Sequence, residues 1–462
     1  MSYIKALPVK MFLSGIFLIL IPLLFADIAV FYILTCCLVL GCVVSCLLSS
    51  GLTERFYLFG IFFTVFLLAL LFCTIANLGY LQNGDFFVFS DQKFFYYTAD
   101  QLAAYPSIDS IFKACFIDRI HIENEGAFFL FGTIGYIADN YFGKNSVFIQ
   151  SIGVSFIFVL SSLFVYKIFR NFLSETLAYK YTLLFSLFSP IFYYSPWLLR
   201  DIHIAFFYTV GIYLVYKRLS ILSIVSFLLL FIITFEFRFE HGLFFLVFFI
   251  AHLYYNREQN MWIKRLWPFF LITGISAFAY ILFLNLKTLT ETLDVLNYYE
   301  EYTTEALTDN SIGAKLYGLP PVVKQVVLVL NSQLTPLPPW VDLNFGNNIF
   351  IILAALVLLG VSVYWSYVFL FIVFSLVLNF KAFKKFSTSF IVLIAISVLF
   401  LFFNTTNMNV RRVMAVYPVF FIIYALLREN SNDYNKNKTI HIYATLAYIL
   451  LLLAYIVMKF FL

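Results

Sequence analysis

Two acidic residues after a long apolar run could act as a general base at a membrane surface. Asp91 lies within the aromatic stretch 86–97, and Asp85 precedes that stretch. We expect the apolar surroundings to hold Asp91 at or just below the membrane interface, where burial disfavours the charged form of a carboxyl group and suits it to proton abstraction. Asp85 is the competing candidate. A solvated loop acid is the alternative interpretation of Asp91.

Arginines beside the ends of apolar runs could bind phosphate, because the planar guanidinium group matches phosphate oxygens. Arg200 and Asp201 follow the segment 195–197, and Arg238 and His241 belong to Glu-Phe-Arg-Phe-Glu-His at 236–241. Snorkelling of Arg200 to water, or pairing of each arginine with its neighbouring acids, is the structural alternative.

A later pair of arginines, Arg411 and Arg412, opens an apolar run that continues through Tyr417 and Pro418. This pair opposes the positive-inside trend in the orientation given below, so we expect a ligand to use it. Anchoring of the helix at the interface is the alternative.

No motif predicts a nucleotide, metal or disulfide site. The six cysteines lie mostly inside apolar runs and show no Cys-x-x-Cys spacing. There is no P-loop and no Gly-x-Gly-x-x-Gly sequence. His203 and His241 are weak indicators of a metal, so no metal ligand is assigned, and a divalent metal stays an open alternative. No nucleic-acid partner is expected.

The elements that position these residues follow from the composition. Apolar residues make up 63% of the 462 residues, aromatic residues 21% and charged residues 11%. A soluble protein could not bury so much apolar surface, and a disordered chain would be poor in aromatic residues. The apolar runs are too continuous for the alternating strands of a membrane β-barrel. The sequence therefore predicts an all-α, polytopic membrane protein.

A membrane-spanning helix needs about 20 apolar residues, and this predicts about thirteen spans (11–14). The run 11–48 should hold two helices divided at Asp27. The other spans are expected near 57–80, 146–168, 181–197, 202–217, 219–235, 242–255, 266–285, 348–380, 387–403, 411–427 and 440–460. The run 348–380 is long enough for a tilted span plus an interfacial segment.

The distribution of charge predicts a cytoplasmic N-terminus. With that orientation, the inner loops hold more than half of the 29 basic residues and few of the 24 acids, as the positive-inside rule requires. The chain then divides into N-terminal spans (1–81), a first outer loop (82–145), a central bundle (146–285), a second outer loop (286–346) and C-terminal spans (347–462). The expected location is a bacterial cytoplasmic (inner) membrane.

The order of these features resembles the C-type (GT-C) membrane glycosyltransferases, which take a sugar from a polyprenyl-phosphate or polyprenyl-diphosphate carrier at the outer face. The similarity is clearest over 85–255 and weaker over 404–425. It is carried by Ser90 and Asp91 with Tyr96 and Tyr97, by the stretches 125–129 and 142–143, by Ser195 and Pro196 with Arg200 and Asp201, and by Arg411 and Arg412 with Tyr417 and Pro418.

The resemblance implies a fold with two long outer loops and a site shared between them and the helix ends. Asp91 would be the catalytic carboxylate. Many members have a second acid beside it, whereas Gln92 stands there in this sequence, which leaves Asp85 as a partner or replacement. The residues expected to contact the lipid phosphate or the substrate are Arg200, Asp201, Arg238, His241, Arg411, Arg412 and Tyr97.

The partners implied are a polyprenyl-linked sugar donor, a lipid-linked or polysaccharide acceptor, and membrane lipid. The chain is also similar to O-antigen and exopolysaccharide repeat-unit polymerases, and Arg200 and Gly211 match an Arg–Gly spacing described for some of them. A lipid-oligosaccharide flippase or transporter is the third alternative, although transporters usually place charges within spans and have repeated halves.

Overall fold

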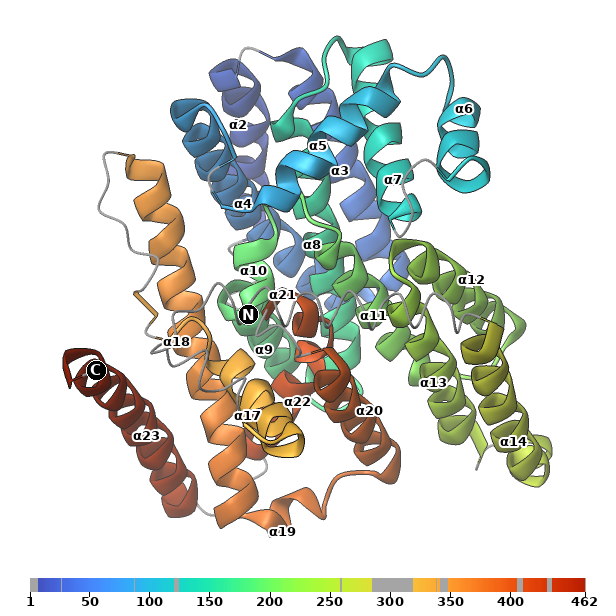
Figure 1. Ribbon diagram of the computed structural model, residues 1–462, viewed down its shortest axis with the longest axis vertical. Coiled ribbons are helices and arrows are strands. Elements are labelled where there is room, and N and C mark those ends of the chain that lie inside the picture. The colour runs from blue at the N-terminus through green and yellow to red at the C-terminus, as the bar shows by residue number, and fades with distance from the viewer. Residues whose placement is uncertain are drawn as a thin grey trace. The chain divides into compact units, whose positions relative to one another are not determined.

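The computed structural model describes residues 7–25, 27–86, 88–119, 124–257, 260–284, 319–337, 339–340, 348–404, 410–429 and 434–461 (Figure 1). The described residues are 86% helical and contain no strand, which confirms the all-α prediction. Most of the predicted second loop, 286–346, lies outside the described residues, as do Glu123 and the segment 405–409.

Long apolar helices identify the chain as an integral, multi-pass membrane protein. Among the described residues, seven helices are long and apolar enough to cross a membrane. They are Leu7–Phe25, Ile28–Leu48, Leu52–Asn83, Val147–Phe169, Ile349–Leu378, Val410–Glu429 and Asn437–Val457. Shorter apolar helices occupy Asp201–Val215, Ile221–Phe237 and Thr388–Phe402. The number of spans and the orientation stay predictions.

The chain divides into two compact units that are each discontinuous in sequence. Unit 1 comprises Met1–Tyr213, Leu228–Gly242 and Asp342–Val361, and unit 2 comprises Leu214–Phe227, Leu243–Val341 and Ser362–Leu462.

In unit 1, the predicted division of the first apolar run at Asp27 is confirmed. Helix α2 (Leu7–Phe25) ends before this residue and α3 (Ile28–Leu48) begins after it. The Asp27 carboxylate accepts a hydrogen bond of 2.8 Å from the amide of Ala29, so it satisfies a donor that the first turn of α3 would leave free. Helix α4 (Leu52–Asn83) packs against both.

Helices α8 (Val147–Phe169) and α9 (Glu175–Phe188) complete the packed core around α4. The single helix expected over 181–197 is interrupted: α9 ends at Phe188 and the short α10 (Pro190–Tyr194) follows. Ser189 between them is extended, at φ −93° and ψ 155°. The residue before a proline avoids the helical region, and Pro190 has no N–H to continue the helix.

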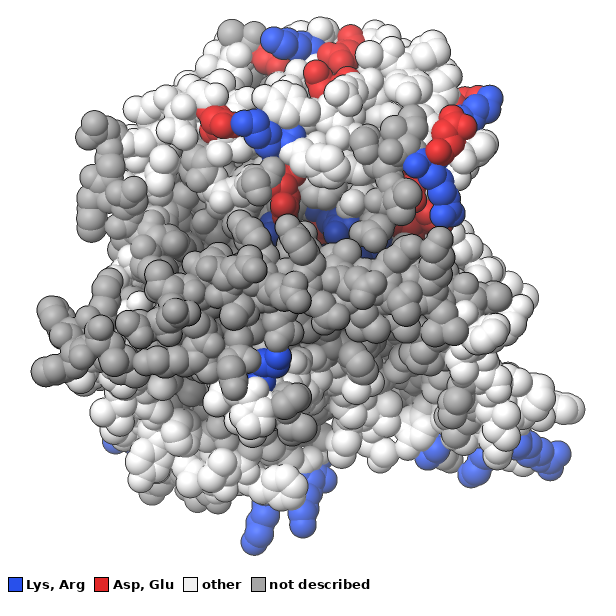
Figure 2. Space-filling view, in the orientation of Figure 1, with Lys and Arg blue, Asp and Glu red and all other residues white. Residues whose placement is uncertain are grey.

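The predicted first loop of unit 1 is helical. It contains α5 (Ser90–Ala103), α6 (Ile108–Phe112), the π-helical segment η1 (Lys113–Ile117), α7 (Glu125–Ile137) and the π-helical segment η2 (Ala138–Phe142). Figure 2 shows acidic and basic side chains next to one another over these helices, and the exposed ion pairs Lys93–Asp85 and Lys113–Asp109 belong to this region.

Helices α5 and α7 run in parallel, so their N-terminal ends lie together. Phe94 and Phe128, near the two starts, have ring centroids 5.3 Å apart. Further along, a Cβ atom at Gly132 would lie 2.8 Å from Cβ of Leu102. The glycine therefore permits an approach that any larger residue would prevent.

Three further helices follow in the chain: α11 (Asp201–Val215), α12 (Ile221–Phe237) and α13 (Phe239–Asn256). The start of α11, the end of α12 and the start of α13 belong to unit 1, and their other ends belong to unit 2. In unit 2, the Asn256 side chain donates to the carbonyl of Lys217 at 3.0 Å and accepts from the amide of Leu219 at 2.9 Å. It thereby fixes the α11–α12 connection to α13.

The remaining described helices of unit 2 are α14 (Met261–Leu284), α17 (Pro321–Leu334), the later part of α18 (Ile349–Leu378), α19 (Phe380–Phe383), α20 (Thr388–Asn404), α21 (Val410–Val413), the 3-10 segment η4 (Met414–Val416), α22 (Tyr417–Glu429) and α23 (Tyr434–Phe461). The run 348–380, for which the sequence allowed a tilted span plus an interfacial segment, holds one continuous helix of 30 residues, α18, and the short α19 follows.

Candidate functional site

Arg238 lies in the short break between α12 and α13 and carries two ion pairs. Its Nη1 is 3.7 Å from Oδ1 of Asp201, the first residue of α11, and its Nε is 3.0 Å from Oε1 of Glu240. The Arg238 and Asp201 side chains are only 11% and 13% exposed. Partly buried charges must be matched to be tolerated, so this guanidinium group joins the start of α11 to the α12–α13 turn.

Arg200, directly before α11, links two other segments. Its Nη1 donates to Oδ1 of Asn124, at the start of α7, and to the carbonyl oxygen of Phe237, at the end of α12, the latter at 3.2 Å. Its own carbonyl accepts from the amide of Ile204 at 3.1 Å, which begins α11. We call Asn124, Arg200, Asp201, Arg238 and Glu240 the Arg200–Arg238 cluster.

Two further acids adjoin this cluster where α7 meets α12. Glu125, in the first turn of α7, is buried at 6% exposure, and Glu236 is half-buried near the end of α12. Gly126 permits the contact, because a Cβ atom there would lie 2.6 Å from Phe237 and 3.1 Å from the backbone of Glu236. The region therefore combines several carboxylates with two guanidinium groups.

The two candidate bases lie around the start of α5. Asp91, in the first turn of α5, is exposed, so the predicted burial of its carboxyl group among its aromatic neighbours is not found. Asp85 is exposed as well and pairs with Lys93 at 3.0 Å. The hydrogen bonds from Lys93 and from the Phe86 amide lower the pKa of Asp85. The ion pair with Lys93 favours the unprotonated form of Asp85, which makes this carboxylate a weaker base.

The start of α5 lies beside the segments that lead into the Arg200–Arg238 cluster. The ring of Phe89 is 6.3 Å from that of Trp197, three residues before Arg200. Phe94, one turn after Asp91, contacts Phe128, one turn after Glu125. Asp91 therefore belongs to the same end of unit 1 as the cluster. Tyr97 is half-exposed and contacts Tyr96, with ring centroids 5.7 Å apart.

His241 and His203 lie in the interior of unit 1 close to the cluster. His241 is 1% exposed, and its backbone carbonyl accepts a 3.3 Å hydrogen bond from the Tyr208 hydroxyl. The ring of His203 packs between Phe131 and Phe237, at 5.4 and 5.6 Å. The ring of His241 contacts that of Tyr208, with centroids 5.7 Å apart, and its predicted contact with the substrate stays a prediction.

Arg411 and Arg412 belong to unit 2. Both lie in α21 and are half-buried. The following Tyr417 is fully buried and stacks on Trp365, with ring centroids 3.9 Å apart. Their convergence with Arg200 on one site stays a prediction.

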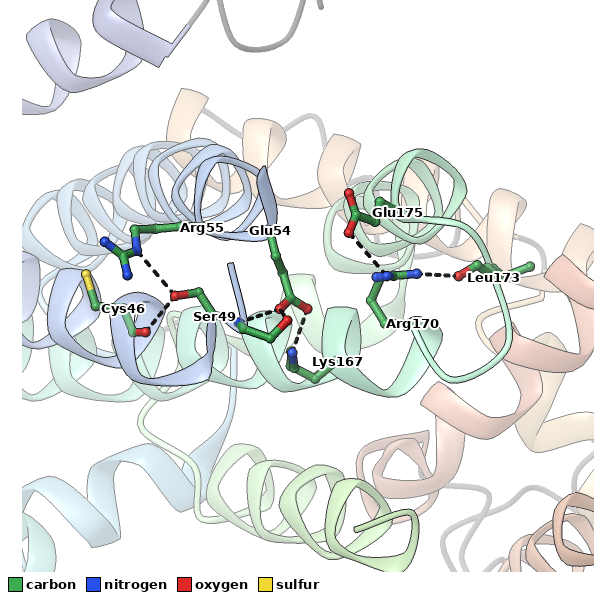
Figure 3. Close-up of polar contacts among 9 residues, drawn as sticks. Cys46, Ser49, Glu54, Arg55, Lys167, Arg170, Leu173 and Glu175 are labelled. Carbon is green, nitrogen blue, oxygen red and sulfur yellow. Dashed lines mark hydrogen bonds and ion pairs between the residues drawn. The ribbon is translucent and has the colours of Figure 1, made fainter. Parts of the chain in front are cut away.

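A second polar cluster of unit 1 lies where α4 begins and α8 ends (Figure 3). The Lys167 ammonium group is 2.5 Å from Oε1 of Glu54, and the side chains are 12% and 5% exposed. The other carboxylate oxygen accepts from the amide and hydroxyl of Ser50, at 2.7 and 2.5 Å. Nearby, Arg170 pairs with Glu175 at 3.2 Å.

Within the described ranges, no three His, Cys, Asp or Glu side chains are grouped as a metal would require.

Sequence reasoning missed Asn124 as a partner of Arg200. The available signal was local: asparagine before Glu-Gly-Ala and an apolar run is typical of a helix start, but its contact with Arg200 is a tertiary feature.

Comparison of the chain with protein-family models, curated proteins and solved structures found no match.

Proposed function

We propose that this protein is a membrane glycosyltransferase that uses a polyprenyl-phosphate-linked sugar donor in the assembly of a surface polysaccharide or glycolipid. Arg200 and Arg238 bind the phosphate of the donor. Asp91 takes the proton of the acceptor hydroxyl group as its oxygen attacks the anomeric carbon. The bond from that carbon to the phosphate oxygen breaks, and the phosphate leaves with the electron pair, stabilised by the guanidinium groups.

The proposal includes the finer topology. About thirteen spans and a cytoplasmic N-terminus place the Arg200–Arg238 cluster at the outer ends of α11 and α12. The prenyl chain would reach the site from the lipid. Asp201 and Tyr97 would contact the donor or acceptor.

One observation carries the proposal: Arg200 and Arg238 are held at neighbouring helix ends by contacts from α7, α11, α12 and α13. Guanidinium groups held in place on a scaffold are suited to binding a phosphate group. The first turn of α5, with Asp91, lies at the same end of unit 1. A base and a phosphate site are the two parts that sugar transfer from a lipid phosphate requires.

The direct test is binding of undecaprenyl phosphate, the carrier left after transfer, to the full-length protein in nanodiscs. Arg200→Ala should raise Kd at least about tenfold, because a hydrogen bond to a charged group is lost. Arg55→Ala is the control, since Arg55 is an exposed arginine of the same unit that contacts Ser49. Equal affinity of wild type and Arg200→Ala would contradict the proposal.

A repeat-unit polymerase is the second candidate, because arginines at helix ends would equally hold a lipid-linked oligosaccharide. Cells that carry Arg200→Ala distinguish the two. A polymerase defect leaves single lipid-linked repeat units on the surface, whereas a transferase defect leaves a saccharide that lacks one sugar. Mass spectrometry of the lipid-linked intermediates measures the difference.

A further inference from the structure

Asn124 occupies a helix-start position without using its side chain for the helix. It precedes Glu125, the first residue of α7, and the amide of Phe128 bonds to its carbonyl. Asparagine is among the best N-cap residues because its side-chain oxygen accepts from the first turn. Here no side-chain cap hydrogen bond is formed, and the Asn124 oxygen accepts from Arg200. The side chain therefore binds Arg200 instead of capping α7.

Two serine N-caps of unit 1 use their side chains for the helix, whereas Ser174 before α9 forms no side-chain cap hydrogen bond. The Ser146 hydroxyl caps α8 by accepting from the amide of Ile149 at 3.3 Å, and the Ser107 hydroxyl caps α6 by accepting from the amide of Ser110 at 3.1 Å. Asn124 therefore differs from these caps in the partner of its side chain.

The contact fixes the orientation of the Arg200 guanidinium group. One nitrogen, Nη1, donates to two oxygens from different segments: Oδ1 of Asn124 and the carbonyl of Phe237. Because the group is planar, fixing both hydrogens of one nitrogen sets the plane of the rest. The close approach at Gly126 brings α7 and α12 near enough for both bonds.

We propose that Asn124 is a positioning residue that orients Arg200 for the lipid phosphate. This inference rests on the proposed function. It predicts that a substitution at this position can weaken phosphate binding while it keeps or raises stability. The reason is that a side chain that caps α7 well no longer holds Arg200. A residue with a merely structural role would lower both together.

The test uses Asn124→Ser in the full-length protein in nanodiscs, with undecaprenyl phosphate as the probe. Serine is a good N-cap residue but is too short to keep the contact with Arg200. We expect Kd to rise about 10- to 100-fold, the loss expected when a charged group loses a hydrogen bond, while Tm stays unchanged or rises. Asn124→Asp keeps an acceptor oxygen at the same reach, so the bond to Arg200 is kept. Its added negative charge weakens anion binding, most strongly at low salt.

Ser146→Ala is the matched control, because it removes a true cap: Tm should fall by a few degrees with Kd unchanged. A double-mutant cycle completes the test. In the Arg200→Ala background, Asn124→Ser should cause no further rise in Kd. Unchanged Kd in Asn124→Ser, or a Tm loss parallel to the loss of binding, would overturn the inference alone. Unchanged Kd in Arg200→Ala would overturn the proposed function.

Discussion

The two polar clusters of unit 1 contain the same kinds of residues but differ in how their charges are matched. Glu54 and Lys167 form a one-to-one pair at 2.5 Å, and Ser50 binds the second carboxylate oxygen. Arg238, by contrast, is shared between Asp201 at 3.7 Å and Glu240 at 3.0 Å. In the first cluster each charge is matched by one close partner, whereas in the second one guanidinium group is shared by two carboxylates at longer N–O distances.

The difference separates a structural pair from a candidate site. A buried ion pair with satisfied oxygens holds helix ends together and has little to offer a ligand. In the Arg200–Arg238 cluster the charges are not matched one to one: Arg238 is shared between two carboxylates, and Arg200 donates to the neutral oxygens of Asn124 and Phe237. Substitutions in the first cluster should therefore alter stability, and substitutions in the second should alter binding and transfer.

The largest effect is expected for Asp91→Asn. If Asp91 is the base, its loss should lower the rate of sugar transfer about 10²- to 10⁴-fold. Asp91 is exposed, so Tm and the Kd for undecaprenyl phosphate should stay close to the wild-type values. The measurement is transfer in membranes that contain equal amounts of each variant. Full activity of Asp91→Asn would remove this residue from the mechanism.

For Lys167→Met we expect a large loss of stability without a loss of binding. Removing one partner of a buried pair leaves the other uncompensated and costs about 3–5 kcal/mol, so Tm should fall markedly with Kd unchanged. Glu175→Gln is the matched control: the Arg170–Glu175 pair is more exposed, and its loss should cost less than about 1 kcal/mol. A rise in Kd in Lys167→Met without loss of Tm would show that the comparison of the clusters is wrong.

Much of the fold follows from sequence, because apolar runs and helix signals are local. The division at Asp27 was predictable because an acid within an apolar run suits a helix N-cap. The interruption at Pro190 was readable from its lack of an N–H, yet the strongly apolar run around it favoured one helix. Apolar length alone does not fix continuity when a proline lies inside the run.

The individual residues of the candidate site could be predicted from the sequence, but the contacts between them could not. Arg200, Asp201 and Arg238 stood out as charges beside apolar runs, and the structure joins Arg238 to Asp201. The Asn124–Arg200 contact depends on the approach of two helices at Gly126. The pairing of Glu54 with Lys167 was missed for the same reason, since each residue lies at the end of a different helix.

The smallest effect is expected at the exposed pair of Asp85 and Lys93, which lies close in sequence to Asp91. The hydrogen bonds from Lys93 and the Phe86 amide lower the pKa of Asp85. Its favourable interaction is therefore present at neutral pH and is lost only as pH falls through the lowered pKa. Exposed pairs contribute little.

Asp85→Asn should consequently leave Kd, Tm and transfer within about twofold of wild type at neutral pH, because an exposed pair has little energy to lose. Measured beside Asp91→Asn, this variant decides between the two acids, since both remove one negative charge from the same short segment. If Asp85→Asn abolished transfer and Asp91→Asn did not, the base would be Asp85. The Lys93 pair would then have to open during each turnover, which predicts a rate that increases with ionic strength as the pair is screened.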